Sequence, residues 1–372
     1  MNIRHARVYR KRRAPGRFVR LLAITLLLTA LAAAAACSNG GERDGAAGAG
    51  ADGKPAGANA NEVTLVIGAY SVVKDAFAEL LPKFQAFWKE QTGQTVVFQE
   101  SYEASGTQAR AIAGGFEADV AVLAMAGDID KIKKAGFISH SWNEAPDAGM
   151  ITRSIVVLGT REGNPKQIRG WEDLTRDDVK VLYPNPKTSG GAQWDINAIY
   201  GAGLKKSEAE TGKADPDYAK AFLQRVHERV ESLDKSGRAS MAAFEYGVGD
   251  VIVTYENELL ARIKQGVPYE IVIPETTILI ENPAAIVDAN VNKHGTRKVA
   301  EAFLDYLHGP DAQRIFTDYG FRPVLAEVAA ETGDKYVTPP GLFDIEYLGG
   351  WDFVREQLYS AKGIWYQVLA GL

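Results

Sequence analysis

Residues 184–195 read Pro-Asn-Pro-Lys-Thr-Ser-Gly-Gly-Ala-Gln-Trp-Asp and separate two regular segments. The apolar run before them, residues 179–183, predicts a buried strand, and a helix is expected from Ala192 onward. Ser189 is a natural N-cap, and the two glycines after it have no Cβ, so their amides can approach a ligand closely. The first amides of a helix lack intrahelical partners, and the macrodipole places about half a positive charge there. The stretch is therefore either a plain capped turn or an anion site.

The N-terminal residues 1–36 have the composition of a signal peptide. Eight basic and no acidic residues fill positions 1–20, the apolar run 21–28 follows, and a string of alanines ends at Cys37, the only cysteine. This pattern resembles a bacterial lipoprotein signal, which predicts lipidation at Cys37; ordinary cleavage that leaves a free thiol is the alternative. Residues 38–61 contain no large apolar side chain, so residues 37–61 are expected to form a lipid-anchored flexible linker.

The charge of the mature chain argues against nucleic acid as a partner. Without the first 36 residues the chain has 34 basic residues against 47 acidic ones, a net charge of −13. A bound anion must then be held by local dipoles or by a local basic patch. With no second cysteine there is no disulfide, and roughly 310 folded residues suggest two lobes.

Strands alternate with helices along the body of the chain, which predicts an α/β fold with parallel sheets. We expect a first lobe from residues 62–153, a second lobe from residues 154–255, and a return to the first lobe with C-terminal helices over residues 256–372. Ligands of such sheets lie at the carboxyl ends of strands. The strand-to-helix loops at Ser105, Ser189 and Gly237 are therefore predicted to meet at one small ligand.

The order of the motifs along residues 63–372 resembles the sulfate-binding proteins of bacterial ABC importers. Those motifs are Ala104-Ser105-Gly106 with Gln108, Glu117–Val120, Gly163–Ile168, Pro184–Gly191, Gly249–Val251, Glu256–Glu258, Arg322-Pro323 and Gly349–Trp351. The resemblance implies the two-lobed type II periplasmic-binding-protein fold, in which each lobe is a mostly parallel sheet flanked by helices. It also places the ligand in the cleft between the lobes.

The resemblance further implies which groups hold the ligand. In this family a dianion is held by backbone amides and hydroxyls, with no charged side chain in contact. Carried over by position, the ligand-binding residues are Ser71, Ser105, Ser189, Gly190, Gly191, Gly237 and Tyr255. Arg238 either orients the Gly237 loop from the second layer or forms a surface salt bridge. The sequence departs from the family at Ser71, usually an aspartate, and at Tyr255, usually a tryptophan whose indole N–H donates.

A site made only of donors selects oxyanions by their protonation. Sulfate offers only acceptors at neutral pH, whereas phosphate keeps a proton that would leave a buried donor unpaired. Because none of the assigned donors titrates between about pH 5 and 8, the affinity for sulfate should be nearly flat there. The expected function is capture of sulfate and its delivery to an ABC importer. Thiosulfate, molybdate or tungstate is the alternative ligand, and anion sensing by a lipoprotein is the alternative role.

The sequence contains no motif that indicates an enzyme. The histidines, at positions 5, 140, 227, 294 and 308, form no short metal-binding pair, and no Gly-x-Ser-x-Gly motif occurs. We therefore expect no catalysis, no cofactor and no metal. We expect a monomer, either lipid-anchored to the outer face of the cell membrane or periplasmic, whose partners are membrane permease subunits.

Overall fold

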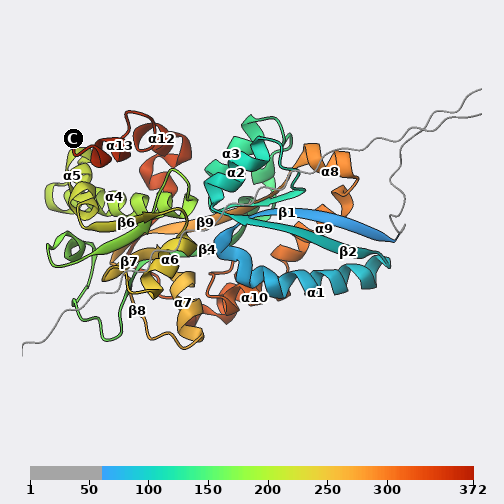
Figure 1. Ribbon diagram of the computed structural model, residues 1–372, viewed down its shortest axis with the longest axis horizontal. Helices are drawn as coiled ribbons and strands as arrows, with labels where there is room; N and C mark the ends of the chain where they lie inside the picture. The colour runs from blue at the N-terminus through green and yellow to red at the C-terminus, as the bar shows by residue number, and fades with distance from the viewer. Residues whose placement is uncertain (1–60) are drawn as a thin grey trace, which may run out of the picture. The chain divides into compact units, whose positions relative to one another are not determined.

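A ten-stranded mixed sheet organises residues 61–372, the part of the chain that the computed structural model describes (Figure 1). Its strands are β1 (Glu62–Tyr70), β2 (Thr95–Glu103), β3 (Val120–Val122), β4 (Met150–Thr160), β5 (Val181–Pro184), β6 (Val230–Asp234), β7 (Val251–Tyr255), β8 (Glu270–Val272), β9 (Thr276–Ile286) and β10 (Gly341–Phe343).

Helices connect and cover these strands. The α-helices are α1 (Lys74–Thr92), α2 (Ser105–Ala113), α3 (Ala126–Lys134), α4 (Gly190–Thr211), α5 (Pro216–His227), α6 (Gly237–Glu245), α7 (Glu256–Lys264), α8 (Asp288–His294), α9 (Arg297–His308), α10 (Pro310–Asp318), α11 (Ala326–Glu331), α12 (Gly350–Gln357) and α13 (Ile364–Leu369). Short 3-10 turns are η1 (Ser71–Val73), η2 (Trp142–Glu144), η3 (Pro146–Gly149), η4 (Trp171–Thr175), η5 (Gly333–Lys335) and η6 (Ile345–Leu348). Within residues 61–372 we find no helix long and apolar enough to cross a membrane.

The strand order β2-β1-β3-β9-β4-β7-β5-β6 divides into two parallel groups. Strand β1 pairs parallel with β2 and β3, and β5 pairs parallel with β6 and β7. Between the groups, β4 and β9 pair antiparallel with each other, and each then pairs antiparallel with one group, β9 with β3 and β4 with β7. In Figure 1 these two long strands lie between the β1 and β2 end of the sheet and the β6 end. They are the strands that both groups share.

Local sequence explains where the key helices begin. Ser189 caps α4, because its Oγ accepts the amide of Ala192 at 3.2 Å, as the sequence predicted. Asp215 caps α5 in the same way, with Pro216 at the first helical position. The strands next to these helices, β5 and β7, are buried along their whole length.

The structure corrects the sequence reading at three strands, β6, β9 and β8. The sequence pattern of residues 233–240 favours a turn, but Val230–Asp234 form β6, a short strand whose burial pattern has no clear alternation, and α6 begins at Gly237. The sequence favours a short strand at residues 285–287. Residues 285 and 286 are instead the end of an eleven-residue strand, β9, whose internal Asn282 and Pro283 interrupt the strand pattern. The sequence also favours a strand at residues 270–273 as part of the return to the first lobe. That strand forms as β8, but it pairs with Leu158–Thr160 of β4, next to β7.

Candidate functional site

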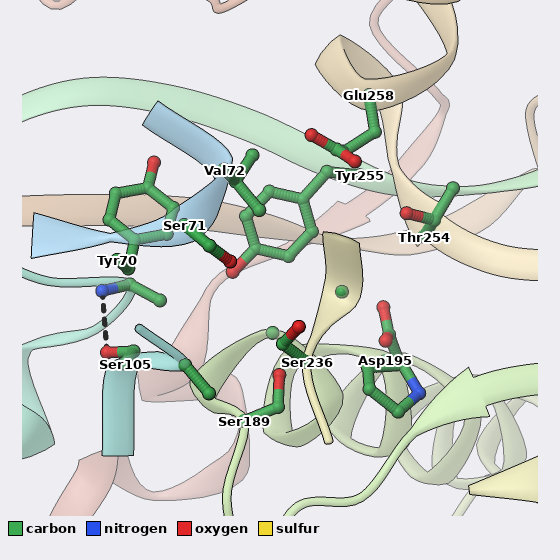
Figure 2. Close-up of a pocket in the computed structure, with 15 residues that line it drawn as sticks. Tyr70, Ser71, Val72, Ser105, Ser189, Asp195, Ser236, Thr254, Tyr255 and Glu258 are labelled. Atoms are coloured by element: carbon green, nitrogen blue, oxygen red, sulfur yellow. Dashed lines mark hydrogen bonds between the residues drawn. The ribbon is translucent and has the colours of Figure 1, made fainter. Parts of the chain in front are cut away.

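The carboxyl ends of six parallel strands open onto one small cavity (Figure 2). Its volume is about 20 Å³. That is little more than the roughly 10–15 Å³ that one enclosed water requires, so the cavity suits a small ion and not a sugar or an amino acid. The lining residues are Tyr70, Ser71, Val72, Ala104, Ser105, Ala124, Pro184, Ser189, Gly191, Asp195, Ser236, Gly237, Thr254, Tyr255 and Glu258.

Two capping serines face this cavity from neighbouring strand ends. Ser189 precedes α4 and Ser236 precedes α6, and each Oγ accepts the amide three residues later at 3.2 Å. Because each hydroxyl oxygen is used as an acceptor, its hydrogen is free to donate to a ligand. The amides of Gly190, Gly191 and Gly237 lie in the first turns of these helices, where no intrahelical acceptor exists. The two turns thus present hydroxyl and amide hydrogens to the same space.

Ser105 contributes differently from the other two serines. Its Oγ donates to Asp128 at 2.6 Å and accepts the amide of Ala124 at 2.9 Å, the bond drawn in Figure 2. With the hydroxyl committed to these bonds, the group left for a ligand is the backbone amide of Ser105, the first residue of α2. The donor that the sequence predicts at this helix start is therefore the backbone amide of Ser105 and not its hydroxyl.

The glycines of the Ser189 turn stand where side chains would not fit. A Cβ on Gly191 would lie 3.3 Å from the Oγ of Ser189 and 3.5 Å from the ring of Tyr255. A Cβ on Gly190 would come within 3.1 Å of Ser105 and Asp128. Gly190 does not itself line the cavity, but it forms the contact between the start of α4 and the start of α2. The absence of Cβ atoms thus lets these helix ends approach closely.

Tyr255 ends β7 and covers one side of the cavity. The residue is 3% exposed, and its hydroxyl has no hydrogen-bond partner among residues 61–372. Burial raises the pKa of Tyr255 well above its ordinary value, so the hydroxyl keeps its hydrogen. In Figure 2 the ring extends from the β7 side toward Ser71. A buried hydroxyl without a partner is costly, so this hydroxyl is a candidate donor to a bound group.

No cation lines the cavity within the described residues, whereas two acids do, Asp195 and Glu258. The guanidinium of Arg238 bonds to Asp75 at 2.9 Å and lies 3.9 Å from the lining residue Glu258. Arg238 is therefore neither a lining group nor a plain surface residue: it joins α6 to α1 directly behind the Gly237 turn. The side chain of Lys187 is exposed.

The structure brings together six of the seven predicted ligand residues, all except Gly190, around this one cavity. Sequence reasoning missed Ser236 and Asp195 as lining residues. The first could have been found, because Ser236-Gly237-Arg238-Ala239 repeats the Ser-Gly-x-Ala pattern that begins at Ser189. The second, Asp195, lies one helical turn after Gly191 and so shares its face.

Cys37, the predicted lipidation site, lies outside the described residues. Among residues 61–372 no cluster of three or more metal-binding side chains occurs.

An α/β sheet of this topology with an enclosed cavity at the strand ends defines the class of periplasmic binding proteins, as the sequence predicted. Residues 65–322 match the family of bacterial extracellular solute-binding proteins. The solved sulfate-binding protein SubI of Mycobacterium tuberculosis superposes with a TM-score of 0.73 at 33% identity, covering 80% of this chain and 100% of that one.

Two sequence relatives narrow the assignment from the class of periplasmic binding proteins to one family. The chain is 42% identical to the sulfate-binding protein of Synechococcus elongatus, over 83% of this chain and 88% of that protein. It is 35% identical to the thiosulfate-binding protein of Escherichia coli, over 80% and 90%. The chain belongs to the sulfate-binding protein family.

Proposed function

We propose that this protein captures sulfate outside the cytoplasm and delivers it to an ABC importer. The observation that carries the proposal is the cavity itself, which is lined by hydroxyls and helix-start amides and has room for one small ion. An oxyanion there would be held by dipoles without a cation in contact. The names of the relatives, sulfate-binding proteins in two bacteria and in a solved structure, support sulfate as the ion.

The proposed donors come from both strand groups. One group would provide the amides of Ser71 and Ser105, and the other the Ser189 hydroxyl. The second group would add the amides of Gly191 and Gly237 and the Tyr255 hydroxyl, which line the cavity. The amide of Gly190, the first residue of α4, would be a further donor beside them. The Ser236 hydroxyl joins this set from the geometry of its cap. Because all of these groups donate, a protonated oxyanion such as phosphate would leave one donor facing a hydrogen.

The ligand is tested by competition titration on protein stripped of anion by unfolding and refolding in sulfate-free buffer. We expect sulfate to bind and phosphate at a hundredfold excess to leave the sulfate isotherm unchanged. Thiosulfate is the second candidate, because a relative at 35% identity is named for it. Tighter binding of thiosulfate, molybdate or tungstate than of sulfate would overturn sulfate as the natural ligand, and an absence of heat with all of them would overturn the transport function.

We also propose that the cavity forms by closure of two lobes, one made of residues 62–153 with much of 256–372 and the other of residues 154–255 with β8. Contacts between them support this: Arg238 of α6 reaches Asp75 of α1, and Trp194 donates to the carbonyl of Ala124 at 2.7 Å. Strands β4 and β9 run through both lobes and would bend or twist on opening. The radius of gyration of stripped protein in solution scattering should fall when sulfate is added, and an unchanged radius at saturation would count against closure.

The chain's place in the cell is proposed from its N-terminus. Residues 1–36 would act as a signal peptide, and Cys37 would carry the lipid anchor at the outer face of the membrane, with residues 37–61 as linker. The folded part would act as a monomer without enzymatic activity, and its partners would be permease subunits. Detergent phase partition of the expressed protein checks the anchor. The parent should enter the detergent phase and Cys37→Ser should stay in the aqueous phase.

A further inference from the structure

Asp195 is the one lining acid whose charge has no compensation among residues 61–372. It is 1% exposed, and its Oδ1 has no hydrogen-bond partner there. It lies on α4, one turn after Gly191, and lines the same cavity as the Ser189 and Ser236 hydroxyls (Figure 2). A carboxyl group in this position meets any ion that fills the cavity.

The other acids near the cavity have cations beside them. Glu258 lies 3.9 Å from Arg238 and 4.0 Å from Arg262. Asp128 accepts the Ser105 hydroxyl and pairs with Lys131 at 2.6 Å. No lysine, arginine or histidine of residues 61–372 forms such a pair with Asp195. A negative charge on Asp195 would therefore face a bound dianion directly, with little water between them.

The remaining ionisable groups around Asp195 are neutral at physiological pH. Burial raises the pKa values of Tyr183 and Tyr255 well above the ordinary value, and that of Tyr359 likewise. His227, which bonds to the Tyr183 hydroxyl at 2.6 Å, has its pKa lowered by burial. Burial also raises the pKa of the Asp195 carboxyl, which favours its neutral acid. Asp195 is thus the group in this cluster whose charge the bound anion would change most.

We propose that Asp195 binds a proton when the cavity takes up its oxyanion and donates that hydrogen to the cavity, so that anion capture is coupled to proton uptake. This inference rests on the proposed function. The carboxylate, a proton and the free dianion would become a neutral acid beside the bound dianion. Asp195 then acts as a specificity-determining residue, because only an oxyanion that offers an acceptor at this position can use its hydrogen.

Linkage fixes the sign of the pH effect. A bound dianion stabilises the neutral acid, so the pKa of Asp195 is higher in the complex than in the stripped protein. Affinity is then constant below the pKa of the stripped protein and falls by up to about tenfold per pH unit above it. This differs from the flat dependence expected from the assigned donors alone, because that expectation did not include Asp195.

The test is calorimetric titration of stripped protein with sodium sulfate at pH 6.5 and pH 9.0, each in two buffers of different ionisation enthalpy. Burial lowers the pKa of His227, which favours its neutral form across this window. We expect the dissociation constant to rise at least threefold from pH 6.5 to 9.0, with net proton uptake at pH 9.0. A smaller rise, or equal heats in the two buffers at pH 9.0, would overturn the proposal without any variant.

Two variants test which carboxyl group takes up the proton. Asp195→Asn should reduce the pH effect to less than twofold and bind sulfate more tightly than the parent at pH 9.0. Glu258→Gln is the matched control, since it removes another buried lining carboxyl, and it should retain the pH effect. If Glu258→Gln abolishes the effect and Asp195→Asn retains it, the assignment to Asp195 is wrong. Absence of sulfate binding at both pH values would instead count against the proposed function.

Discussion

Replacement of Tyr255 by phenylalanine removes one hydroxyl from the cavity and keeps the ring that covers it. The hydroxyl is buried and has no partner within residues 61–372, so a bound oxyanion is the acceptor that would complete it. A hydrogen bond to a charged group contributes about 1.5–3 kcal/mol. Loss of that amount weakens binding by about tenfold to a hundredfold, since 1.4 kcal/mol corresponds to a factor of ten. Calorimetric titration of stripped Tyr255→Phe with sulfate measures the change.

Tyr70 supplies the matched control for this experiment. It too is a buried tyrosine that lines the cavity, and its hydroxyl also has no partner among the described residues. In Figure 2, however, the Tyr70 hydroxyl points away from the Ser189 and Ser236 hydroxyls. Tyr70→Phe should therefore change the dissociation constant by less than threefold. If Tyr255→Phe binds sulfate as tightly as the parent, or if both variants lose affinity equally, the donor role of Tyr255 is refuted.

Three further substitutions test the surroundings of the cavity. Gly190→Ala places a Cβ within 3.1 Å of three side-chain atoms, so sulfate affinity in a titration should fall at least tenfold while the unfolding temperature of the stripped protein changes little. Arg238→Met should raise the dissociation constant less than tenfold, because its guanidinium contacts Asp75 at 2.9 Å and does not line the cavity. Burial alone would raise the pKa of Asp288, but hydrogen bonds, including one of 2.7 Å from Arg297, hold it below its usual value. Its stabilising effect is then present above about pH 4 and lost as the pH falls. In urea unfolding, Asp288→Asn should cost about 1–3 kcal/mol at pH 7 and less at pH 3.

The helix starts were the most predictable part of the fold. Serine or aspartate before a helical pattern has one dominant local use, so the caps at Ser189 and Asp215 follow from sequence alone. Strand β9 was harder, because pairing with β4 and not its own alternation keeps Thr276–Ile286 extended. Strand β6 has five residues and mixed polarity, and its neighbour β5 stabilises it through pairing.

The lining of the cavity was predictable where residues stand at helix starts and not where their place depends on burial. Ser189 and the two glycines after it carry a local signal for an anion. Asp195 carries no such signal, because an acid in the first turns of a helix is ordinarily solvated and is stabilised there by the positive end of the macrodipole. Only the packing of α4 shows that this carboxyl is enclosed. Likewise, the use of the Ser105 hydroxyl by Asp128 depends on a residue 23 positions away.

Because most of the proposed ligand contacts are main-chain amides, the chemistry of the cavity depends mostly on the path of the backbone and only partly on side chains. Any residue other than proline that preserves the path supplies the same N–H, so positions such as Ser71 can change identity during evolution while the contact persists. Substitutions at such positions would leave the contact with the ligand unchanged. The exceptions are the few places where a side chain itself reaches the cavity, and a change of ligand in a descendant protein would have to begin there.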